Sequence, residues 1–91
     1  MSNELVINRF LNKQCGHTPT RTIINGYYSY KGQTLKSNGL ELINYSTRIA
    51  YHEDGKLYIN ITKYSHTTSK IQTMLKGEAL KYSYDIVEYE G

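Results

Sequence analysis

The chain has 91 residues, a net charge of +3, ten Tyr and a single Cys. This length predicts one domain, residues 1–91, built around one modest core. A single cysteine excludes an internal disulfide, and no apolar run is long enough to predict a membrane span. Because a free thiol suits a reducing compartment, we expect a soluble protein of the cytoplasm.

A short amphipathic helix is predicted over residues 3–13, and Gly16 can end it. Its apolar residues recur at a spacing of four, which places them on one helix face. Residues 14–20 then connect this helix to the strands that follow. The apolar pairs are Val6 with Phe10 and Ile7 with Leu11.

Turns that contain glycine divide residues 21–45 into short antiparallel strands. The first turn, Asn25-Gly26, is the dipeptide most typical of a two-residue hairpin. These strands predict a meander in which Leu40 and Leu42 share one face. The other two turns are predicted at Lys31-Gly32 and at Ser37-Asn38-Gly39.

A longer hairpin is predicted over residues 47–62. Asp54-Gly55 favours a type I′ turn, because its positive φ angles match the twist of paired strands. Apolar residues alternate with polar ones on both arms, which indicates one buried face. The predicted buried residues are Ile49, Leu57, Ile59 and Ile61, whereas Arg48 and His52 point to solvent or to a partner.

A helix of two to three turns is predicted next, ending at Gly77. Ser65, Thr67 and Thr68 are alternative N-caps, since each hydroxyl can accept a hydrogen bond from the first turn. So short a helix is marginal alone and must dock on the sheet. Residues 82–90 predict a last strand with an acidic end. The apolar stripe of the helix is Ile71, Met74 and Leu75.

Together these elements predict an α+β fold. It consists of a small antiparallel β-sheet of hairpins, one N-terminal helix and one short helix after the central hairpin. No long-period repeat or linker divides the chain.

No set of residues predicts catalysis. The histidines are scattered, and neither a second cysteine nor a carboxylate pair stands beside them at metal-ligand spacing. Cys15 and His17 lie close together but lack a third group, and a half-buried cysteine beside a surface histidine explains them. No glycine-rich phosphate loop is present. We therefore expect no enzyme, no metal site and no cofactor.

Tyrosines and basic residues are interleaved in two parts of the chain. Tyr and Arg are common at protein-binding hot spots, and such a surface on a sheet can also bind single-stranded nucleic acid. A pI of about 9.0 permits nucleic-acid contact without requiring it, and strand propensity also favours Tyr. The predicted partner-binding residues are Tyr27, Tyr28, Tyr30, Lys31, Arg48, Lys63 and Tyr64.

A second candidate surface is an anion site at the start of the later helix. Thr67, Thr68, Ser69 and Lys70 combine free amides, hydroxyls and a positive charge. Ordinary N-capping explains the same residues without a ligand.

The segment 44–72 resembles a pattern from small proteins encoded by bacteriophages. In that pattern a Tyr-Ser-x-Thr-x-Ile-Ala strand precedes a turn, a second strand and a Thr-Thr-Ser-Lys sequence. This chain departs from it at His66, where an apolar residue is frequent, and at Ile71, where His is frequent. The resemblance implies a phage protein with a compact β-rich fold and assigns no activity. The matching positions are Tyr45, Thr47, Ile49, Ala50, Asn60, Thr62, Lys63, Tyr64, Ser65, Thr67, Thr68, Ser69 and Lys70.

Small phage accessory proteins frequently act against host defence by stoichiometric binding. The leading hypothesis is therefore a non-enzymatic, anti-CRISPR-like inhibitor that binds a host-defence protein such as a CRISPR effector nuclease. One alternative is an accessory protein that binds nucleic acid through the same surface. Another is a sponge that captures a nucleotide messenger at residues 67–70.

Overall fold

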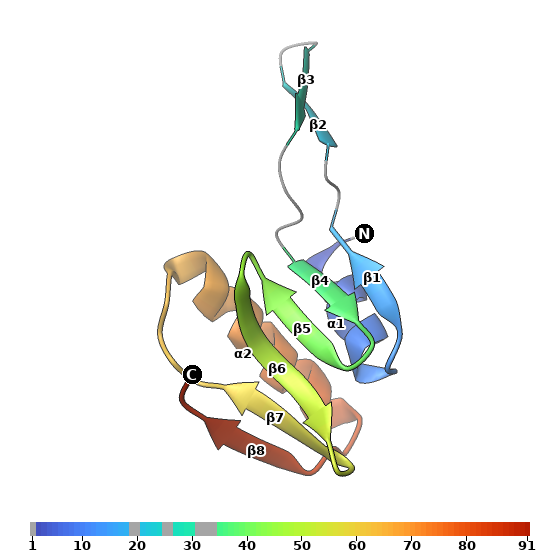
Figure 1. The fold of residues 1–91 in the computed structure, drawn as a ribbon, viewed down its shortest axis with the longest axis vertical. Helices are drawn as coiled ribbons and strands as arrows, with labels where there is room; N and C mark the ends of the chain where they lie inside the picture. Colours follow the sequence, from blue (N-terminus) through green and yellow to red (C-terminus); the bar gives the residue numbers. More distant parts are fainter. Residues whose placement is uncertain (1, 19–20, 25–26, 31–34) are drawn as a thin grey trace.

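The computed structural model describes residues 2–18, 21–24, 27–30 and 35–91. Figure 1 shows the helices and strands that these residues form. The helices are α1 (Asn3–Leu11) and α2 (His66–Lys81). The strands are β1 (Cys15–His17), β2 (Arg21–Ile24), β3 (Tyr27–Tyr30), β4 (Leu35–Asn38), β5 (Glu41–Asn44), β6 (Thr47–Glu53), β7 (Lys56–Asn60) and β8 (Ile86–Tyr89).

Six strands form the main sheet, in the order β1-β4-β5-β6-β7-β8. Neighbouring strands pair antiparallel except β7 and β8, which pair parallel. A parallel neighbour requires a long crossover connection, and α2 supplies it. The predicted α+β fold, with an N-terminal helix and a helix after the central hairpin, is confirmed.

Both helices pack on the same face of the main sheet (Figure 1). α1 lies against β1 and β4, α2 lies against β7, and the two helices contact each other. The apolar pairs predicted for α1 all enter the core between these layers. The core residues are Val6, Ile7, Phe10, Leu11, Leu35, Leu42, Ile49, Ala50, Leu57, Ile59, Ile71, Leu75 and Ala79.

Strands β2 and β3 form a separate two-stranded sheet, which we call the arm. Their register pairs Ile24 with Tyr27, as a two-residue connection requires, although the Asn25-Gly26 turn itself lies outside the described residues. The turn predicted at Lys31-Gly32 also lies outside them. Figure 1 shows the arm beyond the end of the main sheet at which β1 ends and β4 begins. The predicted single meander is therefore wrong for the arm and confirmed for β4 to β7.

The connector predicted between the first helix and the arm contains a strand, β1. α1 ends at Leu11 rather than near Gly16, and Lys13 then turns the chain with a φ of 58°. Gly16 pairs with Ser37 of β4, whose hydroxyl donates to the carbonyl of Gln14 at 2.9 Å. Pairing with a distant strand creates β1, and no local pattern indicates it.

A β-bulge in β6 changes the faces predicted for that strand. Leu42 pairs with Ala50, but the next residue of β5, Ile43, pairs with Arg48, so Ile49 is the extra residue. A bulge of this kind lets two consecutive residues point toward one side. Ile49 and Ala50 are consequently both buried. Beyond the bulge, His52 faces the helices and Tyr51 faces away, the reverse of the predicted alternation.

Three apolar residues lie outside the faces predicted for them. Leu40 is 59% exposed in the turn before β5, Ile61 is 45% exposed beyond the end of β7, and Met74 is 38% exposed on α2. Met74 faces outward because the buried row of α2 follows a spacing of four from Ile71.

α2 is longer than predicted and continues through Gly77 to Lys81. The buried row extends past the glycine to Ala79, so contact with the core outweighs the low helix propensity of Gly. The helix ends where Ser83 adopts a φ of 58°. Gly77 as the helix end is therefore a wrong prediction, since a propensity rule cannot see a distant apolar contact.

Substituting Gly77 with Ala should stabilise the protein. A Cβ added there meets no atom within 4 Å, and helical Gly is less favourable than Ala by about 0.5–1 kcal/mol. The free energy of unfolding, measured in urea, should therefore rise by roughly that amount. Gly55→Ala is the control and should destabilise, because Gly55 has a φ of +75°. If the Gly77→Ala variant were no more stable than wild type, this would contradict the conclusion that position 77 is helical and has room for a methyl group.

His52 connects β6 to the end of α1. Its ring lies 4.5 Å from the ring of Phe10 and 5.4 Å from that of Tyr84. Its Nε2 lies 2.8 Å from the carbonyl oxygen of Phe10, and since a carbonyl only accepts, Nε2 carries the proton. Burial lowers the pKa of His52, and the charge of Lys13 lowers it further, although the bond to Phe10 opposes them.

Stability should therefore fall as His52 is protonated. Its pKa in the folded state lies below the unfolded value of 6.5, so the contribution of neutral His52 is present above that value and is lost as the pH falls. Urea unfolding between about pH 7.5 and about pH 5 should show this loss. His52→Gln should make the free energy of unfolding depend less on pH. The control variant His66→Gln changes an exposed residue at the start of α2 and should leave this pH dependence unchanged. An identical pH profile in His52→Gln would contradict this assignment.

Candidate functional site

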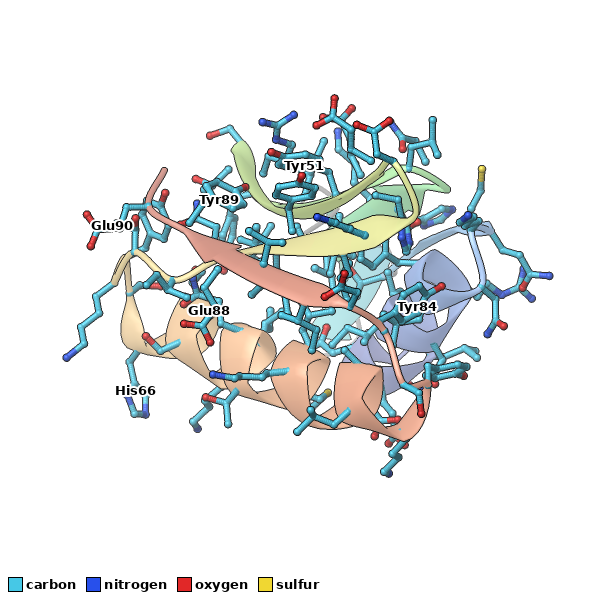
Figure 2. The ribbon with its side chains drawn as sticks, turned by 90° about the horizontal axis from the view of Figure 1, so that it is seen from below. Tyr51, His66, Tyr84, Glu88, Tyr89 and Glu90 are labelled. Atoms are coloured by element: carbon cyan, nitrogen blue, oxygen red, sulfur yellow. The ribbon has the colours of Figure 1, made fainter. Side chains whose placement is uncertain are left out.

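The face of the main sheet opposite the helices displays a cluster of aromatic side chains. Figure 2 shows Tyr51 and Tyr89 on this open side, whereas Tyr84 and Glu88 lie on the helix side. Tyr58 pairs directly with Tyr51 across β6 and β7 and therefore shares its face. We call Arg48, Tyr51, Tyr58 and Tyr89 the tyrosine–arginine face.

The rings of this face are in direct contact. Tyr51 stacks on Tyr58 with centroids 4.7 Å apart and planes inclined by 1°, and it meets Tyr89 at 5.5 Å and 58°. All three tyrosines are half-buried. The rings hold one another in place, so the face is preorganised as a rigid, flat, amphipathic surface.

Arg48 covers the edge of the aromatic cluster. Its Cζ lies 4.1 Å from the centroid of the Tyr51 ring, which is a cation–π geometry. Its Nη1 also lies 3.3 Å from Oε2 of Glu41, and both side chains are partly exposed. An exposed ion pair of this kind contributes little to stability. It does hold the guanidinium in place and offsets its charge.

A buried asparagine supports the face from the end of β7. Asn60 is 1% exposed, and its Nδ2 donates to the Arg48 carbonyl at 3.3 Å and to the Tyr64 hydroxyl at 2.8 Å. The Tyr89 hydroxyl donates to the same Arg48 carbonyl at 3.4 Å. Burial raises the pKa of Tyr89 above 10.0 despite the opposing effect of Arg48, so this hydroxyl remains protonated and able to donate.

A hollow of about 420 Å³ adjoins the face at the β5 and β6 end. Leu40, which is 59% exposed, lies at this hollow and offers an apolar contact beside the aromatic rings. Glu53 adds a second carboxylate to that of Glu41. The lining residues are Leu40, Glu41, Arg48, Tyr51, His52 and Glu53.

The partner-binding residues predicted from the sequence do not form one surface. Arg48 belongs to the tyrosine–arginine face, and Tyr64 lies next to it through Asn60. Lys63 is exposed in the loop before α2. Tyr27, Tyr28 and Tyr30 belong to β3 of the arm, in a separate sheet, and Lys31 lies outside the described residues. The structure therefore divides the predicted surface into two.

Three residues of the face were missing from the predicted site. Tyr58 and Tyr89 could have been found, because each alternates with residues of the apolar face in its own strand. Tyr51 could not, since simple alternation places it beside Ile49, and only the bulge turns it to the open side.

One amide of the first turn of α2 is capped by the residue that precedes the helix. Ser65 is the N-cap, and its hydroxyl accepts from the Thr68 amide at 3.2 Å. Thr68 is buried and donates to Oδ1 of Asn44 at 2.6 Å, which ties the helix to β5. Thr67, Ser69 and Lys70 lie at the same helix end. The anion site at residues 67–70 stays a prediction.

The described residues contain no group of three or more His, Cys, Asp or Glu arranged to hold a metal ion. None of the helices in the described ranges has the length and apolar character needed to cross a membrane.

The chain matches no protein-family model, no curated protein and no solved structure. Its function is accordingly inferred from the geometry of its own surfaces.

Proposed function

We propose that this protein is a non-enzymatic binding protein that contacts another protein through its tyrosine–arginine face. The observation that carries the proposal is the contact cluster of Arg48, Tyr51, Tyr58 and Tyr89 on an uncovered sheet face. Tyr and Arg are enriched at the energetic centres of protein interfaces.

The physical properties of the face suit a protein partner. A half-buried tyrosine offers a large apolar ring with few rotatable bonds, so it loses little conformational entropy on binding. Its hydroxyl can still bond to a partner's backbone. The exposed Leu40 and the neighbouring hollow provide room for an apolar side chain of the partner.

The charges of the face favour protein over nucleic acid as its partner. Arg48 is paired with Glu41, and Glu53 lines the same hollow. Phosphate binding depends on cations that release condensed counterions, and carboxylates beside them oppose it. A protein surface with both signs of charge can complement this arrangement.

The resemblance of residues 44–72 to small phage proteins supports a phage setting for this proposal. We propose that the partner is a host-defence protein, such as a CRISPR effector nuclease, and that the phage protein inhibits it stoichiometrically without turnover. The three contacting tyrosines need no bound cofactor for such a role.

Single substitutions in the face should weaken capture of the partner. A tagged protein is incubated with nuclease-treated bacterial lysate, and bound proteins are identified by mass spectrometry. Arg48→Ala and Tyr51→Ala should each weaken binding by about 2 kcal/mol or more, roughly thirtyfold, because each removes a central contact. Circular dichroism checks that the fold is retained.

Met74→Ala is the matched control, because it shortens an exposed apolar side chain on α2, in the layer opposite the face. This variant should retain the partner. A partner that is captured equally by wild type, Arg48→Ala and Tyr51→Ala would contradict the proposal.

A further inference from the structure

β8 (Ile86–Tyr89) forms one edge of the main sheet. It pairs with β7 on one side, and among the described elements none lies on its other side (Figure 1). The chain after β8 turns back over the end of β7, where the Gly91 amide donates to Oγ1 of Thr62 at 2.9 Å. It therefore leaves the outer side of β8 open. An open strand edge is a template for pairing with another strand.

The outward backbone groups of β8 belong to Ile86 and Glu88. The amide of Ile61, just beyond β7, donates to the Tyr89 carbonyl at 2.8 Å, so Tyr89 turns its backbone groups toward β7. Successive residues of a strand direct these groups to opposite sides, and Val87 consequently also faces β7. The N–H and C=O groups of Ile86 and Glu88 point away from the sheet.

The side chains of β8 divide between the two faces of the sheet. Val87 stands opposite Tyr58 in the register and therefore lies on the open face. Glu88 is the one carboxylate in the sequence of β8 and lies on the helix side (Figure 2). Its Oε1 accepts a hydrogen bond from Nζ of Lys76 at 2.5 Å, and this ion pair offsets its charge.

A second copy of β8, running antiparallel, matches this edge in one register. With Val87 of the two copies directly opposite, Ile86 of each copy stands opposite Glu88 of the other, and the outward groups of these residues exchange hydrogen bonds. A register centred on Glu88 would oppose two carboxylates, and like charges directly opposite destabilise a strand pair. A register centred on Ile86 would place Glu88 opposite Tyr84, which precedes the strand.

We propose that this protein forms a two-fold symmetric dimer in which β8 pairs antiparallel with β8 of a second copy, centred on Val87. A two-fold axis normal to the sheet relates the two strands and makes the contact self-complementary. It joins the two main sheets and keeps both tyrosine–arginine faces on the same side. The dimer contact concerns the sheet edge and holds whether or not the face binds a partner.

Dimerisation should be visible in the mass of the protein in solution. The chain has a mass of 10.5 kDa, and sedimentation equilibrium should show a mass that rises toward twice this value as the concentration increases. A contact made by one strand pair is small, so the dimer should dissociate on dilution. A mass that stays at 10.5 kDa up to a concentration of about 1 mM would overturn the proposal.

Charged substitutions at Val87 test the register. Val87→Lys alone and Val87→Glu alone each place like charges directly opposite across the axis, so each variant should be monomeric. Mixing the two variants places opposite charges there and should restore the doubled mass. If both single variants dimerise as wild type does, or if the mixture stays monomeric, the proposed pairing is wrong.

Ile43→Glu is the matched control, because it adds the same charge at a half-buried β-branched residue of an internal strand, β5. Lys36 and Arg48 stand opposite Ile43 on the neighbouring strands, so the added carboxylate meets positive charge. This variant should dimerise like wild type. Loss of its dimer would count against the proposal, since it would show that the effect does not depend on position 87.

Amide hydrogen exchange of the wild-type protein gives a second measurement that needs no variant. The Val87 amide points toward β7 and should be protected at every concentration. The Ile86 and Glu88 amides point outward and should become protected only as the dimer forms. Protection of these two amides that ignores concentration and appears only with the captured partner would overturn the proposal, because it would assign the edge to that partner.

Discussion

The proposed binding surface depends on one packing constraint: both helices cover the same side of the sheet. Each helix has a single buried stripe, and the two stripes close one core between α1, α2 and the strands. The opposite sheet face therefore needs side chains that tolerate water while shielding the backbone. Tyrosine meets both needs, because its ring covers neighbouring strands while its hydroxyl reaches solvent.

The bulge at Ile49 connects this packing to the site. By adding one residue to β6, it keeps Ile49 and Ala50 in the core and turns Tyr51 to the open side, against Tyr58. The same shift brings His52 under α1, where it bonds to the Phe10 carbonyl. One local irregularity thus completes the core and the aromatic cluster together.

Sequence patterns predicted the elements whose signals are local. The i, i+4 pairs of α1 and the Asp54-Gly55 turn, with φ angles of 51° and 75°, are confirmed. The patterns failed where contacts between distant segments determine the structure: strand β1, the extension of α2 to Lys81 and the separation of the arm. The site was predicted only in part for the same reason, since Arg48 was identified but its aromatic neighbours come together from three strands.

The tyrosine–arginine face on the open side of β6, β7 and β8 is the central surface of the proposed function. Its location can be measured directly by placing a photo-reactive phenylalanine analogue at position 58 and, separately, at position 74. The account predicts that the captured partner crosslinks to the analogue in place of Tyr58 and not to the one in place of Met74. Crosslinking from position 74 alone would contradict the account, because it would place the partner on the helical layer.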